Sequence, residues 1–303
     1  MKTFIRVVEV WVPDTEGVLL VLGSAHYGAA KRFGMSSREM CFGRGEGLPG
    51  AAWEAGHPIV LKQFEGSAFR RTEAAHADGL TCGIAMPVFD GAALKAVVLI
   101  FCGDSPDEAD HQAGAIELWR NAAGSPDLLL EDGCYGATSN VFEYIARRTA
   151  FRKGTGLPGI AWDSGLPVFM DDLGKGGRFL RADGAQKVGI NRGFAMPCST
   201  DGQDAYVMAF LSALATPIVH RFEIWLPGPG GKTLLRREGF CETDGVLDGG
   251  NAAPPSSPAP ALTRALATAV PQVDAATAGQ PLAVVALPVL AAGRVVAVVG
   301  WSL

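Results

Sequence analysis

The sequence predicts an α+β protein made of three consecutive copies of one module, each a mostly antiparallel sheet with packed helices, the third copy truncated. Three observations support this prediction. A block of twenty residues at 42–61 recurs at 151–170 with ten identical positions, an alternating strand that ends in tryptophan opens every copy, and two apolar strands close it. Hairpins at both ends of a module with helices between them are typical of layered α+β folds.

The opening strands are the most regular element of the repeat. They read VEVW at 8–11, IELW at 116–119 and FEIW at 222–225, with apolar and polar residues in alternation. This period of two predicts half-buried strands. Turn residues and a second apolar run follow each one, so we expect an antiparallel hairpin at the start of each copy.

The block that follows contains Gly45, Gly47 and Gly50 in the pattern G-x-G-x-x-G. As a dinucleotide-binding fingerprint this pattern requires a buried strand directly before the first glycine and an acidic residue about 20 positions later. The polar stretch SSREMCFGR precedes Gly45 instead. We therefore expect the glycines to form a tight turn and Pro49 to lie in the first turn of a helix that carries Trp53.

The remainder of the module predicts a short extended piece, a second helix and the two closing strands. The second helix is expected to end at Gly79 or Gly189, since glycine is the common residue after a helix C-terminus. The domain boundaries are expected at 1–106, 107–214 and 215–303. The third copy lacks the glycine block and carries at 244–260 a stretch rich in Pro, Gly and Ser, which predicts a flexible loop.

Composition excludes several classes of partner. The formal charge is −5, with no cluster of Lys and Arg, so we expect no nucleic acid and no membrane as a partner. No apolar run reaches the roughly 20 residues that span a bilayer, and no secretory signal is present, so we expect a cytoplasmic protein. Six dispersed cysteines form no C-x-x-C pair, so no metal site is predicted and the thiols are expected to be structural.

Three motifs in a fixed order carry a family resemblance. G-x-G-L-P-G-x-A-W-x-x-G-x-P, then F-x-R-x-x-x-A-x-x-x-G, then G-x-A-M-P occur in the first two copies. Together they resemble the GAF domain, above all the GAF modules of bacterial multi-sensor histidine kinases and the GAF-like region of plant NIN-like regulators. The resemblance covers 5–103 and 113–212, and 217–303 only through its hairpins. GAF domains bind cyclic nucleotides, tetrapyrroles, haem, oxyanions or nothing, so the resemblance implies a fold without selecting a ligand or cofactor.

The function expected from this resemblance is that of a stand-alone sensory or regulatory protein without an output domain. It would bind a small molecule, signal to a protein partner, assemble as a homo-oligomer and catalyse no reaction. One alternative is a ligand-free scaffold or oligomerisation protein. Another is a thiol redox enzyme similar to the free methionine sulfoxide reductases, whose cysteine pattern this sequence lacks.

Two arginines could have either a structural role or a ligand-binding role. Arg71 and Arg181 recur together with Glu9 and Glu117, which share a sheet face with a tryptophan. They are expected to neutralise these carboxylates, or alternatively to coordinate an anionic ligand. The resemblance implies a ligand cavity beside the second long helix and the strand after it. The candidate ligand-binding residues are Phe69, Arg71, His76, Cys82 and Met86 in the first copy and Phe179, Arg181, Arg192 and Met196 in the second.

Overall fold

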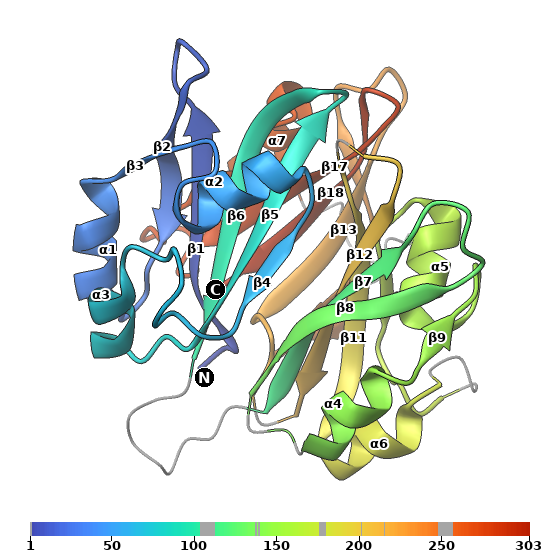
Figure 1. Ribbon diagram of the computed structural model, residues 1–303. Helices are drawn as coiled ribbons and strands as arrows, with labels where there is room; N and C mark the ends of the chain where they lie inside the picture. The colour runs from blue at the N-terminus through green and yellow to red at the C-terminus, as the bar shows by residue number, and fades with distance from the viewer. Residues whose placement is uncertain are drawn as a thin grey trace.

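The computed structural model describes residues 2–103, 113–136, 138, 140–175, 180–200, 202–214, 216–247 and 257–303. These residues form three six-stranded antiparallel sheets, each built from one continuous stretch of the chain (Figure 1). We call the stretches unit 1 (5–102), unit 2 (114–213) and unit 3 (221–302). The predicted fold class is confirmed: the chain contains three α+β units, of which the third is truncated.

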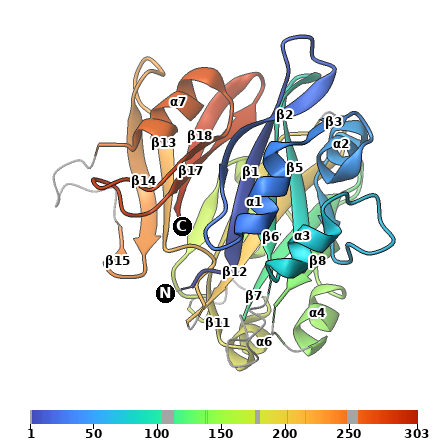
Figure 2. The ribbon, with the colours of Figure 1, turned by 90° about the vertical axis from the view of Figure 1, so that its left-hand side faces the viewer.

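In unit 1 the strand order is β3-β2-β1-β6-β5-β4. Its strands are β1 (Ile5–Pro13), β2 (Leu19–His26), β3 (Cys41–Gly43), β4 (Ile59–Leu61), β5 (Cys82–Asp90) and β6 (Ala93–Cys102). Its helices are α1 (Lys31–Arg38), α2 (Gly47–Ala55) and α3 (Thr72–Ala77). All three helices lie on the outer side of the sheet, where Figure 2 shows α1 and α3 next to each other.

Units 2 and 3 repeat this strand order. Unit 2 contains β7 (Gly114–Asn121), β8 (Leu128–Tyr135), α4 (Asn140–Ala146), β9 (Ala150–Phe151), α5 (Gly156–Ser164), β10 (Val168–Met170), α6 (Ala182–Lys187), β11 (Ile190–Cys198) and β12 (Ala205–Ala213). Unit 3 contains β13 (Arg221–Pro227), β14 (Leu234–Cys241), β15 (Gly245–Val246), α7 (Pro260–Thr268), β16 (Gln272–Asp274), β17 (Val284–Ala291) and β18 (Arg294–Ser302). A single helix, α7, therefore covers the part of the third sheet that the structure describes.

Both ends of the predicted flexible loop at 244–260 belong to regular elements. Gly245 and Val246 form β15, which pairs with the end of β14, and α7 begins at Pro260. Backbone pairing orders the first of these segments, and a proline in the first helical turn suits the second. Residues 248–256 of the predicted loop, and residues 104–112 around the first predicted domain boundary, lie outside the described residues.

The glycine block forms the predicted turn and helix. The amide of Gly45 donates to the carbonyl of Gly50 at 2.8 Å, and α2 begins at Gly47. A Cβ on Gly50 would lie 2.0 Å from the carbonyl oxygen of Gly43, and one on Gly159 in unit 2 would lie 2.3 Å from that of Arg152. The backbones approach so closely that a side chain has no room, which gives these glycines a mechanical role.

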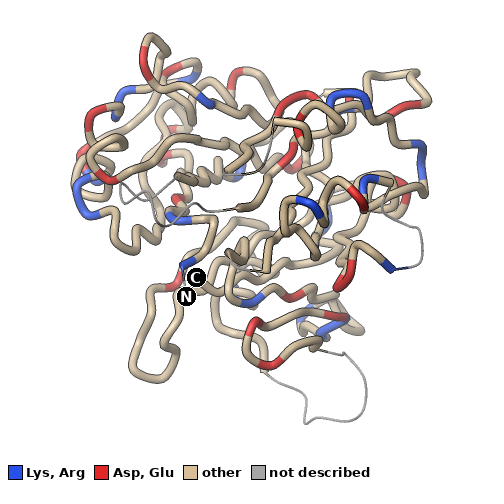
Figure 3. The backbone as a smooth tube through the Cα atoms, turned by 90° about the horizontal axis from the view of Figure 1, so that it is seen from below, with Lys and Arg blue, Asp and Glu red and all other residues tan. Residues whose placement is uncertain are grey.

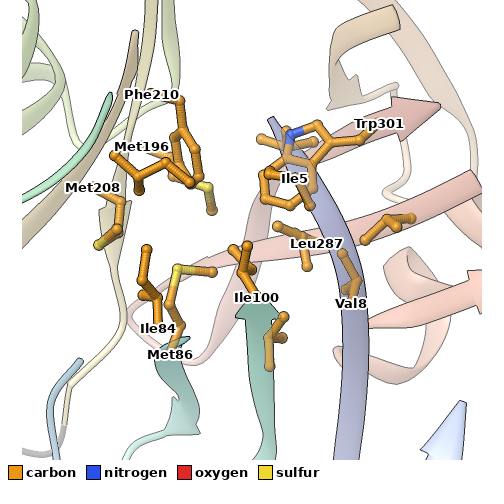
Figure 4. Close-up of a cluster of buried hydrophobic side chains, with 14 of the residues drawn as sticks. Ile5, Val8, Ile84, Met86, Ile100, Met196, Met208, Phe210, Leu287 and Trp301 are labelled. Atoms are coloured by element: carbon orange, nitrogen blue, oxygen red, sulfur yellow. The ribbon is translucent and has the colours of Figure 1, made fainter. Parts of the chain in front are cut away.

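The inner faces of all three sheets pack on one another. One cluster of buried side chains is drawn from every unit, whereas the outer face of each sheet packs on its own helices in a separate cluster. Figure 4 shows labelled members of the common core, which converge from the three sheets. These are Ile5, Val8, Ile84, Met86 and Ile100 of unit 1, Met196, Met208 and Phe210 of unit 2, and Leu287 and Trp301 of unit 3. Burial on both faces explains why the closing strands are apolar throughout.

The edges of the units also meet in a cyclic order. Strand β4 of unit 1 lies beside β8 of unit 2, and β16 of unit 3 lies beside β2 of unit 1. Between units 2 and 3, the ring of Phe169 on β10 lies 5.9 Å from that of Phe240 on β14. We call the contact of β4 with β8 junction 1/2, that of β10 with β14 junction 2/3, and that of β16 with β2 junction 3/1. Because the last unit returns to the first, the three units close into a ring around the common core.

Charged residues are distributed over the whole of the described chain. Figure 3 shows Lys and Arg interspersed with Asp and Glu along the backbone. Among the described residues no helix is long and apolar enough to cross a membrane.

Candidate functional site

The space between the sheet and the helices of unit 1 holds a buried ion pair. Glu9 lies on β1, and Arg71 directly precedes α3. Arg71 Nη1 donates to both carboxylate oxygens of Glu9, at 2.7 and 2.9 Å. Trp11 Nε1 and the Tyr27 hydroxyl donate to the same carboxylate at 2.9 and 3.0 Å. The carboxylate is thus fully partnered, which is the condition for keeping a charge in the interior.

Unit 2 repeats this arrangement. Arg181 donates to the two oxygens of Glu117 at 2.7 and 2.6 Å, and Trp119 and Tyr135 add their own hydrogen bonds at 3.1 and 2.9 Å. Burial, together with the neighbouring carboxylate, raises the pKa of Tyr27 and Tyr135, so both remain protonated donors. The recurrence of all four residues (glutamate, arginine, tryptophan and tyrosine) in two units marks the pair as part of the fold.

Aromatic rings fill the space around Arg71. Its guanidinium carbon lies 4.3 Å from the ring centre of Phe33 and 5.5 Å from those of Phe69 and Phe101. Phe64 stacks on Phe69 with 4.4 Å between ring centres. Side chains of the protein therefore occupy the place where a ligand would lie over the sheet of unit 1.

The structure brings Phe69 and Arg71 together in the outer core of unit 1, and Arg181 lies at the equivalent place in unit 2. The other predicted ligand-binding residues lie elsewhere. His76 is half-exposed and contacts Glu65 at 2.9 Å. Arg192 contacts Glu242 at 2.6 Å across junction 2/3. Phe179 lies outside the described residues.

Three predicted residues point to the opposite side of their sheets. Cys82, Met86 and Met196 belong to the common core, so a sheet separates each of them from the arginine of its own unit. Successive residues of a strand point to opposite faces of the sheet, so a shift of one position along the strand moves a side chain to the other face. For this reason the structure does not gather the predicted residues in one pocket.

Buried thiols meet where units 1 and 2 join. Cys82 and Cys102 are opposite each other on β5 and β6, and Cys134 of unit 2 interacts with both. Burial raises the pKa of Cys82 and Cys102 well above the usual value, which suppresses the thiolate form that a nucleophile needs. Among the described residues, no group of His, Cys, Asp and Glu could hold a metal ion.

A groove of about 440 Å³ lies at junction 3/1. Its lining comes from the end of β2 and the residues after it, from one face of α1, and from the residue that follows β16. The lining residues are Ala25, His26, Tyr27, Gly28, Lys31, Gly34, Met35, Arg38 and Ala275. No Asp or Glu is among the described residues that line it. Burial lowers the pKa of His26, so its ring is neutral at pH 7 and the positive charge of the groove belongs to Lys31 and Arg38.

Sequence reasoning missed this groove, although the repeat contained a signal for it. The two acidic residues Asp132 and Glu143 of unit 2 have Ser24 and Gly34 as counterparts in unit 1. Such differences at aligned positions are visible in the sequence. What could not be foreseen is that unit 3 returns to unit 1 and contributes Ala275 to the lining.

Comparison with known proteins finds similarity to solved structures. No protein-family model and no curated protein matches the chain. The inactive-state GAF domain of A. aeolicus nlh2 is 25% identical, with 35% of this chain and 62% of that chain covered and a TM-score of 0.27. Staphylococcus aureus NreA, mutated in its nitrate-binding site, is 15% identical, with 34% and 77% covered and a TM-score of 0.28.

A third solved structure is an enzyme. The free methionine-R-sulfoxide reductase of Neisseria meningitidis, in complex with its substrate, is 19% identical, with 32% of this chain and 52% of that chain covered and a TM-score of 0.26. The chain thus spans less than two thirds of both the nlh2 domain structure and this reductase. At these scores the likenesses carry no argument about activity. The recurring sequence blocks and the repeated strand order make the chain an array of three similar units, and the solved structures that it resembles include several GAF domains.

Proposed function

We propose that the chain is a small-molecule-binding regulatory protein whose ligand enters the groove at junction 3/1. The observation that supports this is the groove itself, because about 440 Å³ falls within the roughly 300–1,000 Å³ of small-molecule pockets. Its described lining offers neither a thiol nor a carboxylate, so we propose binding rather than catalysis. In this proposal the protein acts in the cytoplasm, as a homo-oligomer, and signals to a protein partner.

The position of the groove suggests how binding would be communicated. Unit 1 supplies the lining except for Ala275 of unit 3, and the two units meet where Val273 donates its amide to Ser24 Oγ at 3.1 Å. A ligand that touches residues of both units favours the closed ring over any arrangement in which the units separate. The partner would then recognise the closed or the open junction.

The experiment is a thermal-shift screen of the full chain against a panel of metabolites. Ala275→Trp fills the groove, and Ala276→Trp, at an exposed neighbour outside the lining, is the matched control. A ligand at 100 times its Kd stabilises the folded state by about 2.7 kcal/mol. We expect such a shift in the wild type and in Ala276→Trp but not in Ala275→Trp. A shift that survives in Ala275→Trp would overturn the groove as the binding site.

A ligand-free scaffold is the second candidate, and the filled outer cores favour it. A ligand over the sheet of unit 1 would have to displace Arg71 from Glu9 or push Phe69 aside, at the cost of exposing a buried charge. Under this alternative, ring closure serves only to make a rigid platform for partners. A panel that shifts neither the wild type nor the control would select the scaffold.

A further inference from the structure

We propose that the groove at junction 3/1 binds a small organic anion, whose carboxylate or phosphate groups are held by Lys31 and Arg38. This inference rests on the proposed function and names the chemical class of its ligand. It comes from a comparison of junction 3/1 with junction 1/2, which is built from equivalent strands and helices but is filled by charged side chains.

The strands of the two junctions can be matched by register. Ser24 pairs with Val10 on β1, and Asp132 pairs with the equivalent Leu118 on β7, so Ser24 corresponds to Asp132. Across the junction, β4 and β16 pair in the same way with β5 and β17. Lys62 follows β4 directly and Ala275 follows β16, so these two residues also correspond.

The helices α1 and α4 are matched by their buried phenylalanines. Phe33 lies 4.3 Å from the guanidinium carbon of Arg71, and Phe142 lies 4.9 Å from that of Arg181. Each ring also makes an edge contact with the tyrosine of its unit, at 6.5 and 6.2 Å. With the two phenylalanines aligned, Arg38 corresponds to Arg147, and Gly34 corresponds to Glu143.

Junction 1/2 is closed by a network of four charges. Lys62 Nζ lies 2.7 Å from Asp132 and 3.3 Å from Glu143. Arg147 lies 2.6 Å from Glu143 and 3.2 Å from Asp132. Two cations therefore neutralise two carboxylates, and their side chains occupy the space between the units.

Junction 3/1 keeps the arginine and lacks the other three charges. Ala275, Ser24 and Gly34 stand where junction 1/2 has Lys62, Asp132 and Glu143, and Ser24 Oγ already accepts the amide of Val273. Arg38 has no ion-pair or hydrogen-bond partner among the residues that the structure describes. An arginine whose two acidic partners have been replaced, in a groove without carboxylates, is complementary to an anion.

The remaining lining indicates that the anion is organic. Lys31 and Arg38 lie seven residues apart on one face of α1, which separates their Cα atoms by about 10 Å along the axis. Met35 and the ring of Tyr27 supply apolar surface between them. The tyrosine can lie against the helix because position 34 is glycine, where a Cβ would be 2.8 Å from the ring. A single inorganic ion would satisfy only one end of this groove.

The test is isothermal titration of the full chain at low ionic strength with citrate, ATP, inorganic phosphate, glucose and spermidine. We expect citrate or ATP to bind at least tenfold more tightly than phosphate, and to weaken as salt is added. The comparison of citrate with ATP distinguishes a carboxylate ligand from a phosphate ligand. Arg38→Gln, at an exposed position, should lower the affinity at least tenfold, and Lys31→Gln provides a second variant should the first fail to fold.

The matched control is Arg147→Gln, which removes the equivalent arginine from the filled junction and should change the affinity less than twofold. Equal weakening by Arg147→Gln and Arg38→Gln would overturn the inference, as would full binding in Arg38→Gln. Binding of glucose or spermidine that Ala275→Trp abolishes, without binding of any anion, would refute the anion class and leave the proposed function standing. Failure of every compound to bind would refute both.

Discussion

Arg71 and Glu9 form an ion pair in which the side chains are 1% and 0% exposed, and Arg181 and Glu117 repeat it in unit 2 with the same two exposures. Such a pair adds little net stability, because the attraction between the charges is offset by the cost of removing both from water. Removing the arginine is different, because the carboxylate then stays buried with only the hydrogen bonds from the tryptophan and the tyrosine of its unit.

The first prediction concerns this pair. Arg71→Ala should lower the free energy of unfolding by about 3 kcal/mol, since the buried Glu9 loses its main partner. Urea denaturation followed by tryptophan fluorescence measures the change. Arg181→Ala should behave alike, whereas Arg70→Ala, which removes an exposed contact with Glu46, should cost less than about 1 kcal/mol. An unchanged stability in Arg71→Ala would favour a ligand-binding role for this arginine.

The second prediction concerns the glycine block. Gly50→Ala should destabilise the fold by about 1–3 kcal/mol, because its Cβ would lie 2.0 Å from the carbonyl oxygen of Gly43 and the backbone would have to move. Gly279→Ala is the control, since a Cβ there meets nothing within 4 Å. Thermal unfolding of both variants measures the difference. Equal melting temperatures would contradict the mechanical role of the block.

The third prediction concerns the six cysteines. Labelling of the native protein with a thiol reagent at pH 8 should modify Cys41 rapidly, since it is the exposed thiol. Burial raises the pKa of Cys198 to about 12 and that of Cys82 and Cys102 well above the usual value, so these react slowly. Mass spectrometry of peptides identifies the labelled residue. Rapid labelling of Cys82 would revive the thiol redox alternative.

The fourth prediction concerns the third unit. A chain that ends at residue 213 loses Leu287 and Trp301 and leaves the inner faces of the first two sheets uncovered. Exposed apolar surface of this extent drives association, so the truncated chain should aggregate or oligomerise. Size-exclusion chromatography with light scattering measures this. A monomeric product with the wild-type stability would show that unit 3 is dispensable for the common core.

The sequence by itself determined the local structure of this protein. Period-two patterns predicted the hairpins, the glycine block predicted the turn before α2, and the recurrence of Arg71 with Glu9 indicated their pairing. These features depend on residues close in sequence or on two positions that recur together. The α+β fold class followed from them, because few arrangements bury one face of a sheet under such helices.

Only the tertiary structure decided how the three units meet. Apolar residues on both faces of β5 and β6 show that both faces are buried, but they do not show which sheets cover the inner face. Local patterns likewise do not show which residues meet in a binding site. Met86 and Arg71 are close in sequence and lie on opposite faces, whereas Ala275 and Arg38 are far apart and line one groove. Ring closure brings them together through side-chain packing between units, which no local pattern encodes.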